Sequence, residues 1–139
     1  MTIAVSLTDD LETCLAIRRK VFIEEQGVSE AEEVDGRDGE AVHFLAEVDG
    51  KAIGTARVLL SDTAGKIGRV AVLRPMRGTG AGQALIAAAV AEIRARGCQE
   101  AVLGAQVSAI GFYERLGFVA RGSEFMDAGI PHREMATAL

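Results

Sequence analysis

The segment from Val70 to Gly82 limits how this chain can fold more than any other part of the sequence. It begins as an apolar strand and is broken by Pro75. It then carries glycine at every second position, directly before an apolar stripe of helical period. A strand that passes through such a turn into a helix leaves the first amides of that helix open at the end of a sheet.

This glycine-rich turn predicts an anion site. The first helical amides have no partners, the helix dipole is positive there, and glycines let an anion approach the backbone. Arg77 adds a fixed positive charge. We expect a phosphate or pyrophosphate on the backbone of Arg77, Gly78, Thr79, Gly80, Ala81 and Gly82. The alternative is a turn whose glycines serve only tight packing.

Two other nucleotide sites fit the turn poorly. A P-loop places Lys and Ser or Thr after its last glycine, and no Lys follows Gly82. A dinucleotide fingerprint spaces its glycines as G-x-G-x-x-G and needs an acid near the end of the next strand. The next strand here ends at Gln106 without an acid.

The remaining pattern predicts an α+β fold with a mixed, mostly antiparallel sheet and helices on its faces. Turns are expected at Asp49-Gly50 and at 127–129. The first four strands form an antiparallel meander, and a crossover helix then makes a parallel pair. Helices are expected over 11–22, 85–93 and 109–116, with Gly27 ending the first, and strands over 3–7, 42–48, 52–60, 66–73, 100–105, 118–121 and 132–138.

Length and charge exclude several classes of protein. The 139 residues fit one domain, 1–139, and the net charge of −5 argues against nucleic acid as the main partner. No apolar run approaches the roughly 20 residues of a membrane span. The N-terminus lacks the basic and apolar parts of a signal peptide, so we expect a cytoplasmic protein. No HExxH or tight ligand spacing suggests a metal.

Two further features of the sequence are its cysteines and a cluster of acidic residues. Cys14 and Cys98 lie far apart, and we expect buried free thiols. Eight acids crowd the segment 24–40 with only Arg37 as a base. This acidic segment is either a solvated loop or a rim that attracts a cationic amine, in which Glu33 and Asp35 could relay protons.

Three blocks of residues carry a resemblance to a known family. Arg77-x-x-Gly80-x-Gly82 resembles the [QR]-x-x-G-x-[GA] acyl-CoA signature of the GNAT superfamily, and Ala109 to Phe118 resembles its A-x-x-F-Y-x-x-x-G-F block. The residues Arg18 to His43, together with Gly129-Ile130-Pro131-His132, are similar to the ElaA-like branch. The resemblance covers nearly the whole chain and implies the GNAT fold, with acetyl-CoA held where two parallel strands splay apart.

The resemblance also implies roles for individual residues. Tyr113 matches the general acid of the family, with an aromatic anchor as the alternative, and His43 is a candidate base or a structural histidine. His132 suits a structural or acceptor-site role better than catalysis. Gln106 stands where many members have Asn. The residues expected at the cofactor besides the glycine-rich turn are Val70, Ala71 and Val72 along the pantetheine arm, Gln106 and Phe112.

These features together predict an N-acetyltransferase. The acetyl group would pass from acetyl-CoA to a primary amine of a small molecule or peptide by direct attack, without a metal. One alternative is a CoA-binding sensor or scaffold without turnover, and another is a nucleotide-binding module. Small acyltransferases of this type often pair, so a homodimer is an alternative to a monomer.

Overall fold

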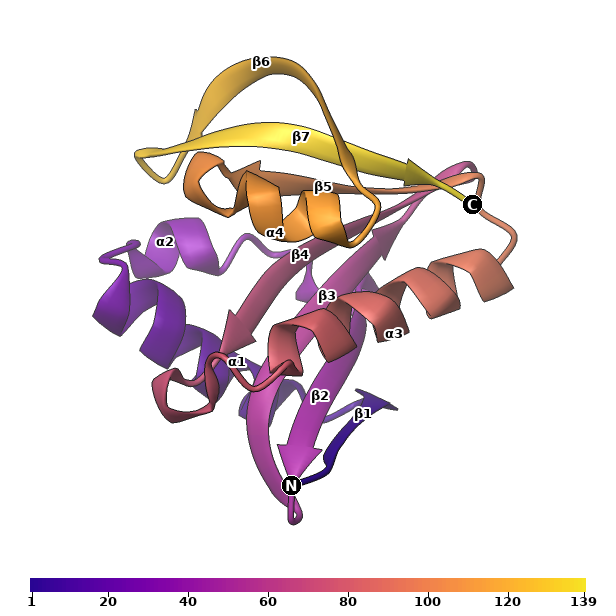
Figure 1. Ribbon diagram of the computed structural model, residues 1–139. Coiled ribbons are helices and arrows are strands. Elements are labelled where there is room, and N and C mark those ends of the chain that lie inside the picture. The colour runs from indigo at the N-terminus through magenta and orange to yellow at the C-terminus, as the bar shows by residue number, and fades with distance from the viewer.

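The computed structural model describes residues 1–139 and contains one seven-stranded sheet flanked by helices (Figure 1). The sheet has the order β1-β2-β3-β4-β5-β7-β6. The helices are α1 (Leu11–Arg18), α2 (Glu30–Glu33), α3 (Ala81–Ala95) and α4 (Ile110–Arg115). The strands are β1 (Ile3–Thr8), β2 (Val42–Val48), β3 (Lys51–Leu60), β4 (Ala64–Val72), β5 (Glu100–Gln106), β6 (Val119–Asp127) and β7 (Ile130–Ala138).

Two-residue turns close both predicted hairpins. Asp49 and Gly50 have φ values of +51° and +77°, and Ala128 and Gly129 have +51° and +76°. Consecutive left-handed residues match the right-handed twist of the strands that they join. The hairpin predictions at Asp49-Gly50 and at 127–129 are therefore confirmed.

The predicted strand directions are also confirmed. Strands β1 to β4 pair antiparallel in succession, and β4 pairs parallel with β5. The difference lies at the far end, where β6 runs to Asp127 instead of ending at 121, and β7 begins at Ile130, two residues before the expected 132. Strand β7 lies between β5 and β6, which leaves β6 as an edge strand with almost all of its side chains exposed.

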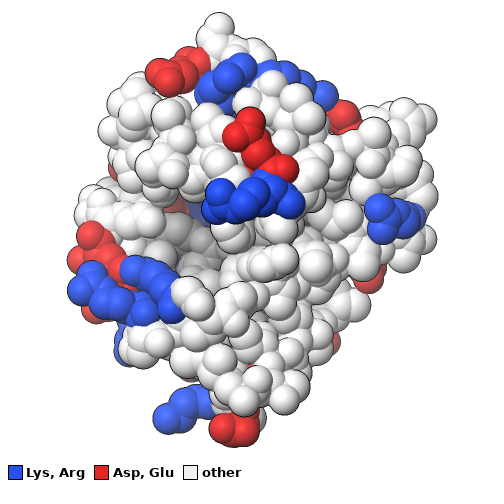
Figure 2. All heavy atoms as spheres, viewed as in Figure 1, with Lys and Arg blue, Asp and Glu red and all other residues white.

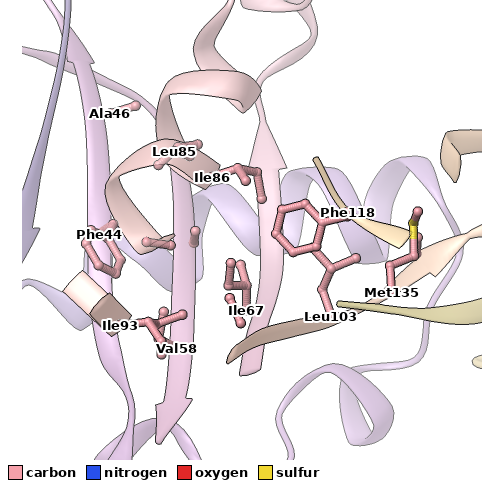
Figure 3. Packing of buried hydrophobic residues seen from close by; sticks show 14 of the residues in the cluster. Phe44, Ala46, Val58, Ile67, Leu85, Ile86, Ile93, Leu103, Phe118 and Met135 are labelled. Carbon is pink, nitrogen blue, oxygen red and sulfur yellow. The ribbon is translucent and has the colours of Figure 1, made fainter. Parts of the chain in front are cut away.

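Alternating side chains give the sheet two separate apolar faces. Phe44 and Ala46 of β2 join the large core beneath α3, whereas Leu45 between them joins a smaller core beneath α1. Figure 3 shows Leu85, Ile86 and Ile93 of α3 facing side chains of the sheet in the large core. Helices therefore cover both faces of the sheet, as the pattern predicted.

The first helix starts and ends as expected but changes its winding. Asp10 caps it by accepting a hydrogen bond from the Thr13 amide at 3.1 Å. After Arg18 the chain continues as a π-helical segment, Arg19–Glu25, which the sequence did not predict. Gly27 follows with φ +72° and ends the helix. Cys14 and Cys98 are both buried free thiols, which confirms that prediction.

Close packing of α3 on β4 yields a test of the large core. A Cβ atom on Gly65 would lie 2.4 to 2.8 Å from three side-chain atoms of Ile93, which is fully buried. We expect Gly65→Ala to lower the free energy of unfolding by about 1–3 kcal/mol, because the core would be overpacked. Gly68→Ala is the matched control, because a Cβ there meets nothing within 4 Å. Urea denaturation measures both, and equal stabilities would contradict this packing.

Candidate active site

Strands β4 and β5 pair over only part of their length and then separate. Their parallel pairing joins Ala64–Ile67 to Glu100–Leu103 and goes no further, although β4 continues to Val72 and β5 to Gln106. Figure 1 shows the two strands diverging from the shared end. The sheet thus contains a fork, defined here as the gap between 68–72 of β4 and 104–106 of β5.

A β-bulge accounts for this fork. Thr55 of β3 pairs with Ala71, but Arg57, two residues on, pairs with Gly68, three residues back, so β4 carries one extra residue. Arg69 lies in this bulge with φ +49°, a left-handed conformation that a non-glycine residue seldom adopts. Bulges increase the local twist and bend the strand that carries them. The bend directs the end of β4 away from β5.

The fork borders a cavity of about 490 Å³. Its walls come from both fork strands, from the π-helical segment, from the acidic segment, from α4 and from the β6–β7 hairpin. The residues that line it include Gln26, Glu32, Glu33, Asp35, Arg57, Arg69, Gly104, Gln106, Tyr113, Phe125, Asp127 and His132. A volume of this size is typical of a small-molecule site.

The glycine-rich turn lies where the sequence predicted it, at the start of α3. Gly80 is the N-cap, and Gly78 and Gly80 have φ of +77° and +91°. The first helical hydrogen bond runs from the Ala84 amide to the Gly80 oxygen at 3.0 Å. The amides of residues 81–83 therefore have no backbone partner. No neighbouring atom would lie within 4 Å of a Cβ on Gly78 or Gly80, so the turn is open.

The other residues expected at the cofactor lie partly beside this turn. A Cβ on Gly82 would lie 3.8 Å from Phe112 and 4.0 Å from Val72, so the start of α3, the end of β4 and α4 meet there. Figure 2 shows the surface hollowed between the regions over α4 and over the turn, with basic side chains at the edges of the hollow. Val70 and Gln106 line the cavity, whereas Ala71 packs into the small core.

The side chain of Arg77 has partners within the protein. Its Nε donates to the carbonyl oxygen of Val72 at 3.0 Å, and its Nη2 lies 2.7 Å from Oε2 of Glu25. The sequence predicted a fixed charge able to pair with phosphate. In the structure this guanidinium bridges the end of β4 and the end of the π-helical segment.

Tyr113 reaches the cavity from α4. Its ring contacts Phe112 and Phe118 edge-on, with centroids 5.0 and 6.1 Å away. Burial raises the pKa of its phenol above the usual value, so the group stays protonated at neutral pH. Gln106 also lines the cavity and donates to Oε1 of Gln26 at 3.3 Å. The cavity therefore has a protonated tyrosine in its α4 wall.

His43 does not lie with Tyr113. It borders a separate surface hollow, where its Nε2 lies 2.9 Å from the carbonyl oxygen of Asp38. Its Nδ1 is buried without a hydrogen-bond partner. The geometry thus favours a structural role for His43, and its predicted role as the base gains no support. His132, for which a structural or acceptor-site role was predicted, lines the cavity.

The acidic segment forms buried ion pairs. Arg18, 1% exposed, donates to Glu33 at 2.5 Å and to Asp38 at 2.7 Å. Arg57 of β3 also contacts Asp38, and it contacts Asp35. The alternative of a solvated loop is wrong for Glu33 and Asp38. Their carboxylates form ion pairs with Arg18, on an apolar helix face, and Asp38 also pairs with Arg57 of β3. Both arginines interrupt otherwise apolar sequence patterns, and this interruption is the sequence signal that could have indicated buried ion pairs.

Arg69 connects this ion-pair network to the bulge. Its guanidinium donates to the carbonyl oxygen of Glu33 at 3.1 and 3.3 Å and to that of Glu32 at 3.3 Å. Hydrogen bonds from Arg57 hold the pKa of Asp35 well below its usual range. A carboxylate with such a low pKa is a poor proton acceptor, and Glu33 is held by Arg18. Neither acid is therefore suited to the proton relay considered from the sequence.

Comparison with known proteins agrees with this geometry. The acetyltransferase (GNAT) domain model matches residues 9–139. The uncharacterized N-acetyltransferase YjcF of Bacillus subtilis is 34% identical over 128 residues, which cover 91% of each chain.

Two crystal structures agree over almost the whole chain. Escherichia coli ElaA is 28% identical with a TM-score of 0.86, covering 98% of this chain and 99% of ElaA. An acyl-CoA N-acyltransferase from Pseudomonas aeruginosa is 29% identical with a TM-score of 0.87, covering 99% and 100%.

The chain therefore belongs to the GNAT acetyltransferase family and is an acyltransferase, and the predicted GNAT fold is confirmed. No helix has the length and apolar character needed to cross a membrane. No group of three His, Cys, Asp or Glu side chains is arranged to hold a metal ion.

Burial of the network leads to a stability test within α2. We expect Glu33→Ala to lower the free energy of unfolding by about 3–5 kcal/mol, because it leaves the buried Arg18 without its closest partner. Glu30→Ala is the matched control, since the Arg19–Glu30 pair is exposed and worth about 1 kcal/mol or less. Urea unfolding with unchanged m-values compares them, and a loss below about 1 kcal/mol in both would contradict the network.

Proposed function

We propose that the protein is an N-acetyltransferase that transfers the acetyl group of acetyl-CoA to a primary amine of a small molecule or peptide. The observation that carries the proposal is the fork, which has unpartnered helical amides and a protonated tyrosine hydroxyl at its open end. The name of the Pseudomonas relative, an acyl-CoA N-acyltransferase, supports an acyl-CoA donor.

The cofactor would run from the glycine-rich turn into the fork. The open amides at the start of α3 suit a pyrophosphate, which carries its charge to the positive end of the helix. The pantetheine arm would then lie along Val70 to Val72, beyond the last parallel pair, and bond to the backbone as an added strand does. This path brings the thioester to the cavity beside Tyr113.

The acceptor would enter through the opposite wall of the cavity, between the acidic segment and the β6–β7 hairpin. An amine with a pKa near about 10.4 is mostly charged at neutral pH, and the deficit of about 3.4 units corresponds to about 4.6 kcal/mol. A base must therefore take a proton before attack. The neutral amine then attacks the thioester carbonyl, and Tyr113 donates to the departing sulfur.

The alternatives are a CoA sensor without turnover and a nucleotide-binding module. A panel of primary amines, followed by release of free thiol from acetyl-CoA, tests turnover directly. Thermal stabilisation by acetyl-CoA and CoA but not by ATP separates a CoA site from a general nucleotide site, because only a bound ligand raises stability. Stabilisation without thiol release for every amine would favour the sensor.

The glycine-rich turn gives the sharpest test of the cofactor site. We expect Gly80→Asp to weaken CoA binding at least about 100-fold, or about 2.7 kcal/mol, because a carboxylate would face the pyrophosphate at the helix start. Gly97→Asp is the matched control, because Gly97 is also left-handed and open but lies beyond the other end of α3. Calorimetry measures both affinities, and an unchanged affinity in Gly80→Asp would refute the assignment.

Removal of the hydroxyl of Tyr113 tests the chemical step. We expect Tyr113→Phe to lower kcat about 100-fold while the Kd for CoA changes little, because the ring packing is kept and only the proton donor is lost. Because burial raises the pKa of Tyr113, wild-type activity should show no loss from its ionisation below about pH 10. A variant with normal kcat would leave Tyr113 as an aromatic anchor.

A further inference from the structure

His132 lies in the wall of the cavity with one ring nitrogen uncommitted. Its Nδ1 lies 2.7 Å from the carbonyl oxygen of Ile130. A carbonyl oxygen can only accept, so Nδ1 carries the proton, and in the neutral ring Nε2 holds a lone pair. This Nε2 makes no hydrogen bond, yet it is not fully buried. The side-chain nitrogen and oxygen atoms that are fully buried without a hydrogen-bond partner are His43 Nδ1 and Arg57 Nε, and His132 Nε2 is not among them.

The hydrogen bond at Nδ1 and a stacked phenyl ring restrain the orientation of this imidazole. The ring stacks on Phe125, with centroids 5.8 Å apart and planes 26° apart. Phe125 lies over β5 next to Gly104, where a Cβ would come within 3.3 Å of the phenyl ring. His132 pairs with Gln106 across β5 and β7 and is only 8% exposed. The ring therefore presents Nε2 to the cavity in one orientation.

The other titratable groups of the cavity are less suited to accept a proton at neutral pH. Tyr113 is held protonated by burial, and Asp35, Glu33, Arg57 and Arg69 are engaged with one another or with Arg18. An ordinary carboxylate titrates about 6 units below an amine, whereas an imidazole titrates near neutrality. The remaining charged groups that line the cavity are Glu32 and Arg37 of the acidic segment, Lys66 of β4 and Asp127 at the end of β6.

We propose that His132 is the general base that takes the proton from the acceptor amine through Nε2. The proposal rests on the proposed N-acetyltransferase function and assigns the proton acceptor to a histidine that lines the same cavity as Tyr113, whereas His43 borders a separate hollow. The hydrogen bond from Nδ1 to Ile130 keeps the correct tautomer, as a carbonyl partner does for other catalytic histidines. Phe125 holds the ring in place and excludes water from one of its faces.

The protons balance over one turnover. The ammonium gives its first proton to Nε2, and the neutral nitrogen forms a bond to the thioester carbon. The carbon–sulfur bond breaks as the oxyanion collapses, and the thiolate takes the hydroxyl proton of Tyr113. Loss of the thiolate leaves the amide protonated on nitrogen, and this nitrogen gives its extra proton to the Tyr113 phenolate. The imidazolium releases its proton to solvent, so the products are the amide, free CoA and one proton.

The test compares His132→Asn with His43→Asn in the active protein. In His132→Asn the Asn side-chain amide can replace the Nδ1 hydrogen bond but offers no base, so we expect normal thermal stability and a normal Kd for CoA. We expect kcat/KM at pH 7 to fall about 100-fold, and the wild-type inflection near neutrality to disappear from the pH profile. Added imidazole should restore part of the rate. In wild-type protein, nitrogen NMR should show the Nδ1–H tautomer for His132.

Each result separates the assignments. A normal pH profile in His132→Asn, or an Nε2–H tautomer, overturns the role of His132 while the acyltransferase proposal stands. Loss of the neutral inflection in His43→Asn instead would move the base to His43 and also overturn it. If wild-type protein acetylates no amine in the panel although it binds acetyl-CoA, both the proposed function and the role of His132 fall.

Discussion

The β-bulge in β4, at Arg69, is the constraint on which the fork and the cavity depend. The bulge at Arg69 lies two residues beyond Ile67, where the pairing of β4 with β5 ends, and the bend that it introduces favours the separation of the two strands. A non-glycine residue in the left-handed region costs about 1–2 kcal/mol. The guanidinium of Arg69 offsets this cost by donating to the carbonyl oxygens of Glu32 and Glu33. The strained residue thus also binds α2 to the edge of the cavity.

A network of ion pairs joins four segments of the chain at a cost in desolvation free energy. It consists of Arg18, Arg57 and Arg69 with Glu33, Asp35 and Asp38. Buried ion pairs add little net stability, because each charge loses its hydration, but they tolerate few arrangements. The network fixes α1, the acidic segment, β3 and the bulge at one relative position. It therefore holds in place the wall of the cavity to which Glu33, Asp35, Arg57 and Arg69 belong.

Much of the fold followed from local patterns, and the site followed only in part. Hairpin turns, the crossover and the open start of α3 depend on residues close in sequence. The turn at Asp49-Gly50 and the helix start at Gly80 could therefore be predicted. The partners of Arg18 lie 15 and 20 residues away, and nothing local shows which acids an arginine will bury. The two histidines show the same limit. His43 and His132 are equivalent as residue types, and only the folded sheet places His132 at the cavity.

The position of β7 has a consequence for biosynthesis. This strand is the seventh in sequence but lies between β5 and β6, and its Met135 is fully buried in the large core. A nascent chain that has emerged only as far as β6 can build the meander of β1 to β4, yet β5 then has a bare edge and β6 has no partner. The ribosome must therefore release residues 130–138 before the β6–β7 part of the cavity wall can form, and until then that edge of the sheet is open to chaperones or to other chains.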